Sequence, residues 1–145
     1  MDAVPALQVR RTLPNTITQS WPHSVFPILE MNTRPDLMVY CCDLSNTAVS
    51  LVRDHPEYSR GRCHAWVCDV TSDEEWEAAP FTSDSLDIIT LIFVLSAVSP
   101  AKMEAVARNM FKFLKPGGLL MFRDYGRSHV TYLIQHLNVQ ISSCF

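Results

Sequence analysis

The sequence predicts an α/β protein in which helices cover both faces of a parallel sheet. Segments typical of strands and of amphipathic helices alternate along the 145 residues, and this alternation favours parallel strands joined by crossover helices. The most apolar stretch, residues 86–98 (LDIITLIFVLSAV), places apolar residues on both sides of a strand, as a strand covered on two faces requires. We expect this central strand to end near Phe93, because most strands span about 3–10 residues.

Capping and turn residues delimit the other elements. Ser45 and Ser99 stand where two helices begin, and Ser72 with Glu75 has the spacing of a capping box. The sequence Pro116-Gly117-Gly118 is expected to end the helix that follows Ser99. In chain order, we expect a strand at 37–44, a helix at 45–55, a strand at 63–70, a helical turn around residue 76, the central strand, a helix at 99–115 and a strand at 119–122.

The two ends of the chain carry weaker patterns. Three prolines interrupt residues 1–23, which we expect to be irregular. Ser24 could cap a short helix over residues 24–30, although Pro27 lies inside that segment. Residues 130–137 are amphipathic and compatible with a last helix. We therefore divide the chain into a divergent segment (1–23), a main domain (24–127) and a divergent tail (128–145).

Composition narrows the classes of protein. The net charge of −3 argues against a broad nucleic-acid-binding surface, although a local basic patch stays open. The five cysteines form no CxxC pair and have no zinc spacing, so we expect reduced, buried thiols and no metal site. Reduced thiols suit a cytoplasmic location, and Arg10 with Arg11 leaves a mitochondrial one as the alternative. No apolar run reaches the roughly 20 residues of a membrane span, so we expect no membrane association.

Two acids follow successive strands at positions where ligands bind in parallel sheets. Asp43 ends the first expected strand, and Asp69 lies near the end of the second. A carboxylate at such a place can accept hydrogen bonds from both ribose hydroxyls of a nucleotide cofactor, or from an adenine amino group. The alternative is that each acid only caps the helix that follows. Two acids at successive strand ends favour S-adenosylmethionine over a nicotinamide cofactor.

Four segments together resemble the methyltransferase-like family that makes 3-methylcytidine in tRNA. They are YCCDLSNTAVSLV (40–52), RCHAWVCDV (62–70), SLDIITLIFVLSAVSPAKM (85–103) and FLKPGGLLMFRDYGR (113–127). The resemblance implies a class I, Rossmann-like sheet that binds S-adenosylmethionine at its strand ends. It implies cofactor contacts from Asp43, Asp69, Val70 and Ile92, and substrate contacts from Phe93, Ser96, Arg123, Asp124 and Tyr125.

The resemblance also implies a chemistry that needs no catalytic acid, base or metal. Cytosine N3 has a lone pair that attacks the sulfonium methyl group in line, so the protein mainly positions the two reactants. In this reading Arg123 contacts phosphate or base and Tyr125 stacks on the base, whereas an Arg123–Asp124 ion pair is the structural alternative. The implied partners are tRNA and an RNA-modification protein or aminoacyl-tRNA synthetase.

The chain departs from the family pattern in its first part. The family places a strand and a glycine-rich loop before the segment that matches residues 24–29, and the glycines let the backbone approach the cofactor closely. Here the four glycines are at 61, 117, 118 and 126, and no apolar strand precedes residue 24. Either residues 1–23 supply a makeshift first strand or the central strand lacks one neighbour, and the closing antiparallel strands are also missing. We therefore expect a truncated isoform or fragment, and a non-catalytic product that acts through protein interactions or is degraded is the alternative to an enzyme.

Overall fold

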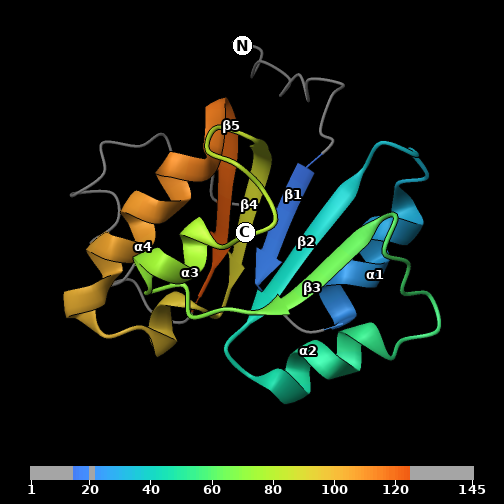
Figure 1. Cartoon of the computed structure of the whole chain (residues 1–145), viewed down its shortest axis with the longest axis horizontal. Helices are drawn as coiled ribbons and strands as arrows, with labels where there is room; N and C mark the ends of the chain where they lie inside the picture. Colours follow the sequence, from blue (N-terminus) through green and yellow to red (C-terminus); the bar gives the residue numbers. More distant parts are fainter. Residues whose placement is uncertain (1–14, 20–21, 125–145) are drawn as a thin grey trace, which may run out of the picture.

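The computed structural model describes residues 15–19 and 22–124. Five parallel strands form one sheet in the order β3-β2-β1-β4-β5. The strands are β1 (Asn15–Gln19), β2 (Met38–Asp43), β3 (Cys63–Val67), β4 (Leu86–Ile92) and β5 (Leu114–Arg123). The helices are α1 (Pro22–Met31), α2 (Asn46–Arg53), α3 (Asp73–Glu77) and α4 (Pro100–Phe113), with a short 3₁₀ turn at Leu95–Ala97. The predicted parallel α/β sheet is confirmed (Figure 1).

The central strand has the neighbour that the sequence did not reveal. Asn15–Gln19 forms β1 between β2 and β4, with Ile17 opposite Tyr40 on one side and Ile89 on the other. The prediction of an irregular segment without a first strand is therefore wrong for these five residues. The segment NTITQ has a single apolar residue, so its pattern is weak, but three of its residues are β-branched. Pairing on both edges then satisfies its backbone groups.

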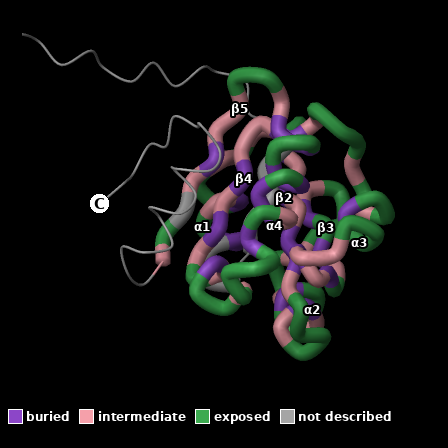
Figure 2. Tube along the Cα trace, turned by 90° about the vertical axis from the view of Figure 1, so that its left-hand side faces the viewer, coloured by how far each residue is buried: buried purple, intermediate pink, exposed green. Residues whose placement is uncertain are grey.

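The two faces of the sheet have separate cores, each covered by its own pair of helices. Figure 2 shows buried segments concentrated in the strands and on the inner sides of the helices. One core joins α1 and α2 to the sheet, and its members are Val25, Phe26, Leu29, Leu37, Val39, Cys41, Val49, Val52, Cys63 and Ala65. The other joins α3 and α4 to the opposite face, and includes Cys42, Trp76, Ile89, Leu91, Val106, Met110, Phe113 and Leu120. Alternation along β2 explains why Cys41 and Cys42 belong to different cores.

Several element boundaries differ from those predicted. α1 begins at Pro22, which suits a first helical position, and it contains Pro27. β3 ends at Val67 rather than 70, because the chain turns where the Ser72 N–H donates to the Asp69 carbonyl at 2.9 Å. β5 begins at Leu114, before the predicted glycine stop, and a register shift between Leu86 and Ile88 absorbs the irregular Pro-Gly-Gly segment.

The helices expected at 45–55, around residue 76 and at 99–115 are present as α2, α3 and α4 with slightly shorter bounds. Ser45 and Ser72 cap the first two through their side chains, whereas Ser99 stands at the N-cap of α4 without a side-chain hydrogen bond. Cys41, Cys42, Cys63 and Cys68 are buried, as expected. Cys144, Tyr125 and the predicted helix at 130–137 lie outside the described residues. Within the described part of the chain, no helix has the length and apolar character needed to cross a membrane.

Candidate functional site

The carboxyl ends of all five strands lie along one edge of the sheet, which the arrowheads in Figure 1 mark. The chain runs from β1 outward through β2 to β3, and then returns to β4 and β5 on the other side of β1. The strand order therefore reverses between β1 and β4. Ligands of open parallel sheets bind beyond the carboxyl ends at such a reversal. Both acids predicted from the sequence lie at this edge.

Asp43 is the last residue of β2 and is half-buried. Its Oδ1 accepts a hydrogen bond from the Ser45 N–H at 2.8 Å, and its backbone carbonyl accepts one from the Cys68 N–H at 3.0 Å. The expected alternative, a local turn-forming role before α2, is thus present. That role uses only Oδ1 of the carboxylate, so it is compatible with ligand binding through Oδ2.

Asp69 lies in the β3–α3 loop, which we define as residues Cys68–Ser72. Its Oδ1 accepts hydrogen bonds from the Thr71 N–H at 2.9 Å and the Thr71 hydroxyl at 2.7 Å. The Thr71 side-chain and backbone hydrogen bonds lower the pKa of Asp69, and the positive charge of Lys102 acts in the same direction. The carboxylate is therefore held ionised, and neither Thr71 bond uses Oδ2.

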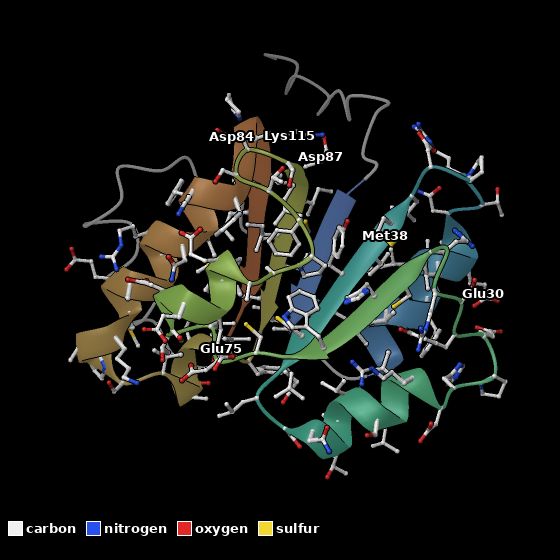
Figure 3. All side chains as sticks on the ribbon, in the orientation of Figure 1. Glu30, Met38, Glu75, Asp84, Asp87 and Lys115 are labelled. Atoms are coloured by element: carbon white, nitrogen blue, oxygen red, sulfur yellow. The ribbon has the colours of Figure 1, made fainter. Side chains whose placement is uncertain are left out.

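The same loop is fixed from α3. The Glu75 carboxylate accepts a hydrogen bond from the Asp69 N–H at 2.6 Å, and the Trp76 Nε1–H donates to the Val70 carbonyl at 2.9 Å. Val70 and Trp76 are buried, whereas Glu75, labelled in Figure 3, is exposed at the end of the sheet. The sequence-based prediction identified Asp69 and Val70 but missed the part played by Glu75 and Trp76.

The ends of β4 and β5 bring together the other predicted site residues. Ile92 is the half-buried last residue of β4. Phe93 follows it with a φ of 57°, a left-handed conformation that is strained for an aromatic residue, and its side chain is 40% exposed. The Phe93 N–H donates to the Arg123 carbonyl at 2.8 Å, and the Arg123 guanidinium lies 5.8 Å from the centre of the Phe93 ring.

Asp124 connects these strand ends to the 3₁₀ turn. Its Oδ2 accepts a hydrogen bond from the Ser96 N–H at 2.9 Å. Phe93, Ser96, Arg123 and Asp124 therefore lie together at the carboxyl ends of β4 and β5. A backbone strained by a bulky side chain is often found at functional sites, where the surrounding structure holds it.

The described residues fit the nucleoside part of a cofactor. The carboxylates of Asp43 and Asp69, at and just beyond adjacent strand ends, can accept from hydroxyl and amino groups, and the half-buried Ile92 ends β4 at the same edge of the sheet. The connection between Gln19 and Pro22 has two residues, Ser20 and Trp21, and no glycine. Among the residues the structure describes, no cluster of His, Cys, Asp or Glu could hold a metal ion.

Comparisons with known proteins agree with this geometry. A family model described as a methyltransferase domain matches residues 23–120. The chain is 53% identical over 111 residues to the tRNA N(3)-cytidine methyltransferase METTL2 of Danio rerio, covering 77% of this chain and 31% of that protein. It is 49% identical to METTL2B of Homo sapiens over the same share of the chain and 29% of that protein. It is 47% identical over 102 residues to METTL6 of Mus musculus, covering 70% of this chain and 35% of that protein.

The chain thus spans about a third of the length of the relatives it matches. Among solved structures, a SAM-dependent methyltransferase from Methanosarcina mazei superposes with a TM-score of 0.60 at 18% identity, covering 95% of this chain and 66% of the other. A putative methyltransferase bound to the Trm112 activator of Haloferax volcanii gives a TM-score of 0.61 at 15% identity, covering 88% and 52%. The parallel α/β fold is the one found in these solved methyltransferase structures, and the family model covers residues 23–120. This chain therefore belongs to the methyltransferase domain family.

Proposed function

We propose that the chain binds S-adenosylmethionine at the carboxyl edge of its sheet, and that the whole protein uses it to methylate N3 of cytidine in tRNA. The observation that carries the proposal is the pair of carboxylates, Asp43 and Asp69, at the ends of the adjacent strands β2 and β3 beside the strand reversal. The tRNA part is supported by relatives named tRNA N(3)-cytidine methyltransferases.

In this proposal each acid has a separate task. Asp43 accepts hydrogen bonds from the ribose hydroxyls through Oδ2, while Oδ1 keeps its bond to the Ser45 N–H. Asp69 accepts from the adenine amino group, and Val70 and Ile92 line the pocket for the base and the sugar. The geometry supports this task, because both Thr71 hydrogen bonds go to Oδ1 and leave Oδ2 out of the Thr71 contacts.

The strand ends of β4 and β5 would hold the target cytidine. Phe93 is exposed and offers a ring for stacking, and Arg123 adds a positive charge for phosphate. Asp124 fixes the Ser96 turn, so the walls of this pocket are tied together. Bound cofactor supplies a methyl group activated by its sulfonium charge. The residues named here orient the base and exclude water, and none of them needs to accept a proton.

The buried cysteines Cys41, Cys42, Cys63 and Cys68 support a reducing compartment for this protein, with the cytoplasm proposed first and the mitochondrion second. Immunofluorescence of the tagged chain distinguishes the two locations. A partner of the RNA-modification or aminoacyl-tRNA synthetase kind is proposed from the resemblance alone, and co-purification of such a protein with the tagged chain tests it.

The proposal is tested by ligand binding and by methyl transfer with the 145-residue chain. Calorimetric titration with S-adenosylhomocysteine should show saturable binding, and Asp43→Ala should weaken it by about 10–100-fold, the effect of losing hydrogen bonds to a charged acceptor. Asp54→Ala, at the exposed opposite end of α2, is the matched control and should bind like the wild type. Tritiated methyl transfer to bulk tRNA then tests the reaction.

The outcomes separate the two function classes. Binding that is lost in Asp43→Ala but kept in Asp54→Ala supports a cofactor site, and transfer to tRNA supports the enzyme. A wild-type chain that melts cooperatively yet binds no S-adenosylhomocysteine would contradict the proposal and favour a non-catalytic product. Binding that is equally strong in Asp43→Ala would show that the β2 acid is only a turn residue.

A further inference from the structure

The β3–α3 loop is held by more contacts than a surface turn of five residues needs. Asp69 accepts two hydrogen bonds from Thr71 and donates its N–H to Glu75. The Val70 carbonyl receives the Trp76 indole N–H, and the Lys102 ammonium group of α4 donates to the Thr71 hydroxyl at 3.2 Å. The loop therefore has anchors on α3 and on α4, although it lies at the edge of the sheet.

The helix that supplies these anchors is itself tied to α4. Asp73 of α3 accepts hydrogen bonds from Asn109 at 2.8 Å and from Arg108 at 3.0 Å, and Glu77 pairs with Lys112. In the core beneath these polar contacts, the Trp76 ring stacks on the ring of Phe113, with centroids 5.3 Å apart and planes at 18°. A five-residue helix has little stability of its own, so these contacts decide where α3 lies.

Glu75 does not make the bond that its sequence spacing suggests. In a capping box the acid three residues after the N-cap would return to the N-cap N–H, which belongs to Ser72. Ser72 does accept from the Glu75 N–H at 3.3 Å, but the Glu75 carboxylate bonds to the Asp69 N–H instead. The carboxylate of an exposed glutamate thus accepts a hydrogen bond from the backbone of a proposed ligand residue, Asp69, which lies three positions before the N-cap.

We propose that Glu75 is a positioning residue for the adenine side of the cofactor site: together with Trp76, it holds the Asp69–Val70 backbone in the shape that receives the base. The inference rests on the proposed function. Because the Thr71 contacts use Oδ1, fixing the Asp69 backbone also fixes where Oδ2 can lie. A loop held in this way before the ligand arrives loses less conformational freedom on binding.

The test uses three variants of exposed residues on α3, so the core stays intact. Glu75→Ala removes the acceptor, Glu75→Gln keeps an oxygen that can accept from the Asp69 N–H, and Glu74→Ala removes the neighbouring exposed acid as a matched control. Amide hydrogen exchange of Asp69 measures the loop without any ligand. Titration with S-adenosylhomocysteine measures the site, and a thermal melt measures the whole fold.

We expect Glu75→Ala to accelerate exchange of the Asp69 amide and to weaken S-adenosylhomocysteine binding about tenfold, each by the loss of one charge-assisted hydrogen bond. Glu75→Gln should restore most of both, Glu74→Ala should change neither, and a cooperative melt of every variant should show that the fold stays intact. Unchanged exchange and affinity in Glu75→Ala would overturn the inference, as would a loss that Glu75→Gln does not rescue. Faster exchange in Glu75→Ala, together with no binding even by the wild type, would show that Glu75 holds the Asp69 backbone but would contradict the proposed function.

Discussion

An aspartate stands at the end of β2 and another in the loop two residues after the end of β3, but the two are held in different ways. Within the described part of the chain, the Asp43 carboxylate is held by a hydrogen bond from the Ser45 N–H, two residues later. Asp69 lies in a loop that is bonded to α3, to α4 and, through Trp76, to the core. The adenine side of the proposed site is therefore formed before a ligand arrives, whereas the ribose side depends mainly on the end of its own strand.

This difference has a clear physical source. The residue after Asp43, Leu44, is 70% exposed, and α2 packs on the other core. The β3–α3 loop instead leads straight to Trp76, which is 3% exposed and belongs to the larger cluster under α4. A buried aromatic residue next to a ligand loop links the position of the loop to the stability of the domain.

The largest expected effect comes from removing that link. Trp76→Ala should lower the free energy of unfolding by about 3–5 kcal/mol, because it deletes a buried ring stacked on Phe113 and a hydrogen bond to the Val70 carbonyl. Leu44→Ala, the matched truncation at the β2 end, should change it by no more than about 0.5 kcal/mol. Urea denaturation followed by circular dichroism measures both.

A second substitution at Trp76 separates the ring from its N–H group. Trp76→Phe keeps most of the buried area and should cost about 1–3 kcal/mol, chiefly by leaving the Val70 carbonyl without its donor. If Trp76→Ala and Leu44→Ala lowered the free energy of unfolding by equal amounts, the ends of β2 and β3 would be held equally firmly by the rest of the domain.

A smaller effect is expected at the two helix caps, which are the matched features of the two regions. The Ser45 hydroxyl accepts from the Ala48 N–H at 3.3 Å, and the Ser72 hydroxyl accepts from the Glu75 N–H at 3.3 Å. Ser45→Ala and Ser72→Ala should therefore each cost about 1 kcal/mol in urea denaturation, and Ser→Thr at either place should cost less. If the costs of Ser45→Ala and Ser72→Ala differed by more than about 1 kcal/mol, the two regions would differ in their helix caps. The contacts from Glu75 and Trp76 of α3 would then not be the main difference.

The fold was largely predictable from the sequence, because its strands and helices carry strong local patterns. The buried residues of β4 and the apolar face of α4 recur at strand and helix periods. β1 was missed because Asn15–Gln19 has one apolar residue, and its strand conformation depends on pairing with β2 and β4, which lie far along the chain.

The site was predictable only in part. Asp43 and Asp69 could be proposed as ligand residues because each acid lies at or near the end of a recognisable strand segment. Glu75 and Trp76 were missed because their bonds to the loop span six residues and exist only once the chain turns at 69–72. The capping-box spacing of Ser72 and Glu75 was the one local signal, and it named the wrong N–H group. A residue that acts through the backbone of another carries no chemical signature of its own.

The smallest expected effect is the contribution of Asp69, in the β3–α3 loop, to the pH dependence of stability. The Thr71 hydrogen bonds lower the pKa of Asp69, so the folded state favours its ionised form. The resulting stabilisation is fully present above the unfolded pKa of about 3.9 and is lost as the pH falls through the lower pKa of the folded state. Thr71→Val removes the hydroxyl donor but keeps the N–H donor, and should weaken this dependence. Asp69→Asn should remove it, while the pKa of Asp73, lowered by its own bonds to Asn109 and Arg108, keeps a separate contribution in both variants. Thermal melts between about pH 5 and pH 2, over which Asp69 changes from its ionised to its protonated form, measure the effect. If the melting midpoint of Asp69→Asn varied with pH in parallel with that of the wild type, the Thr71 contacts would not persist in solution.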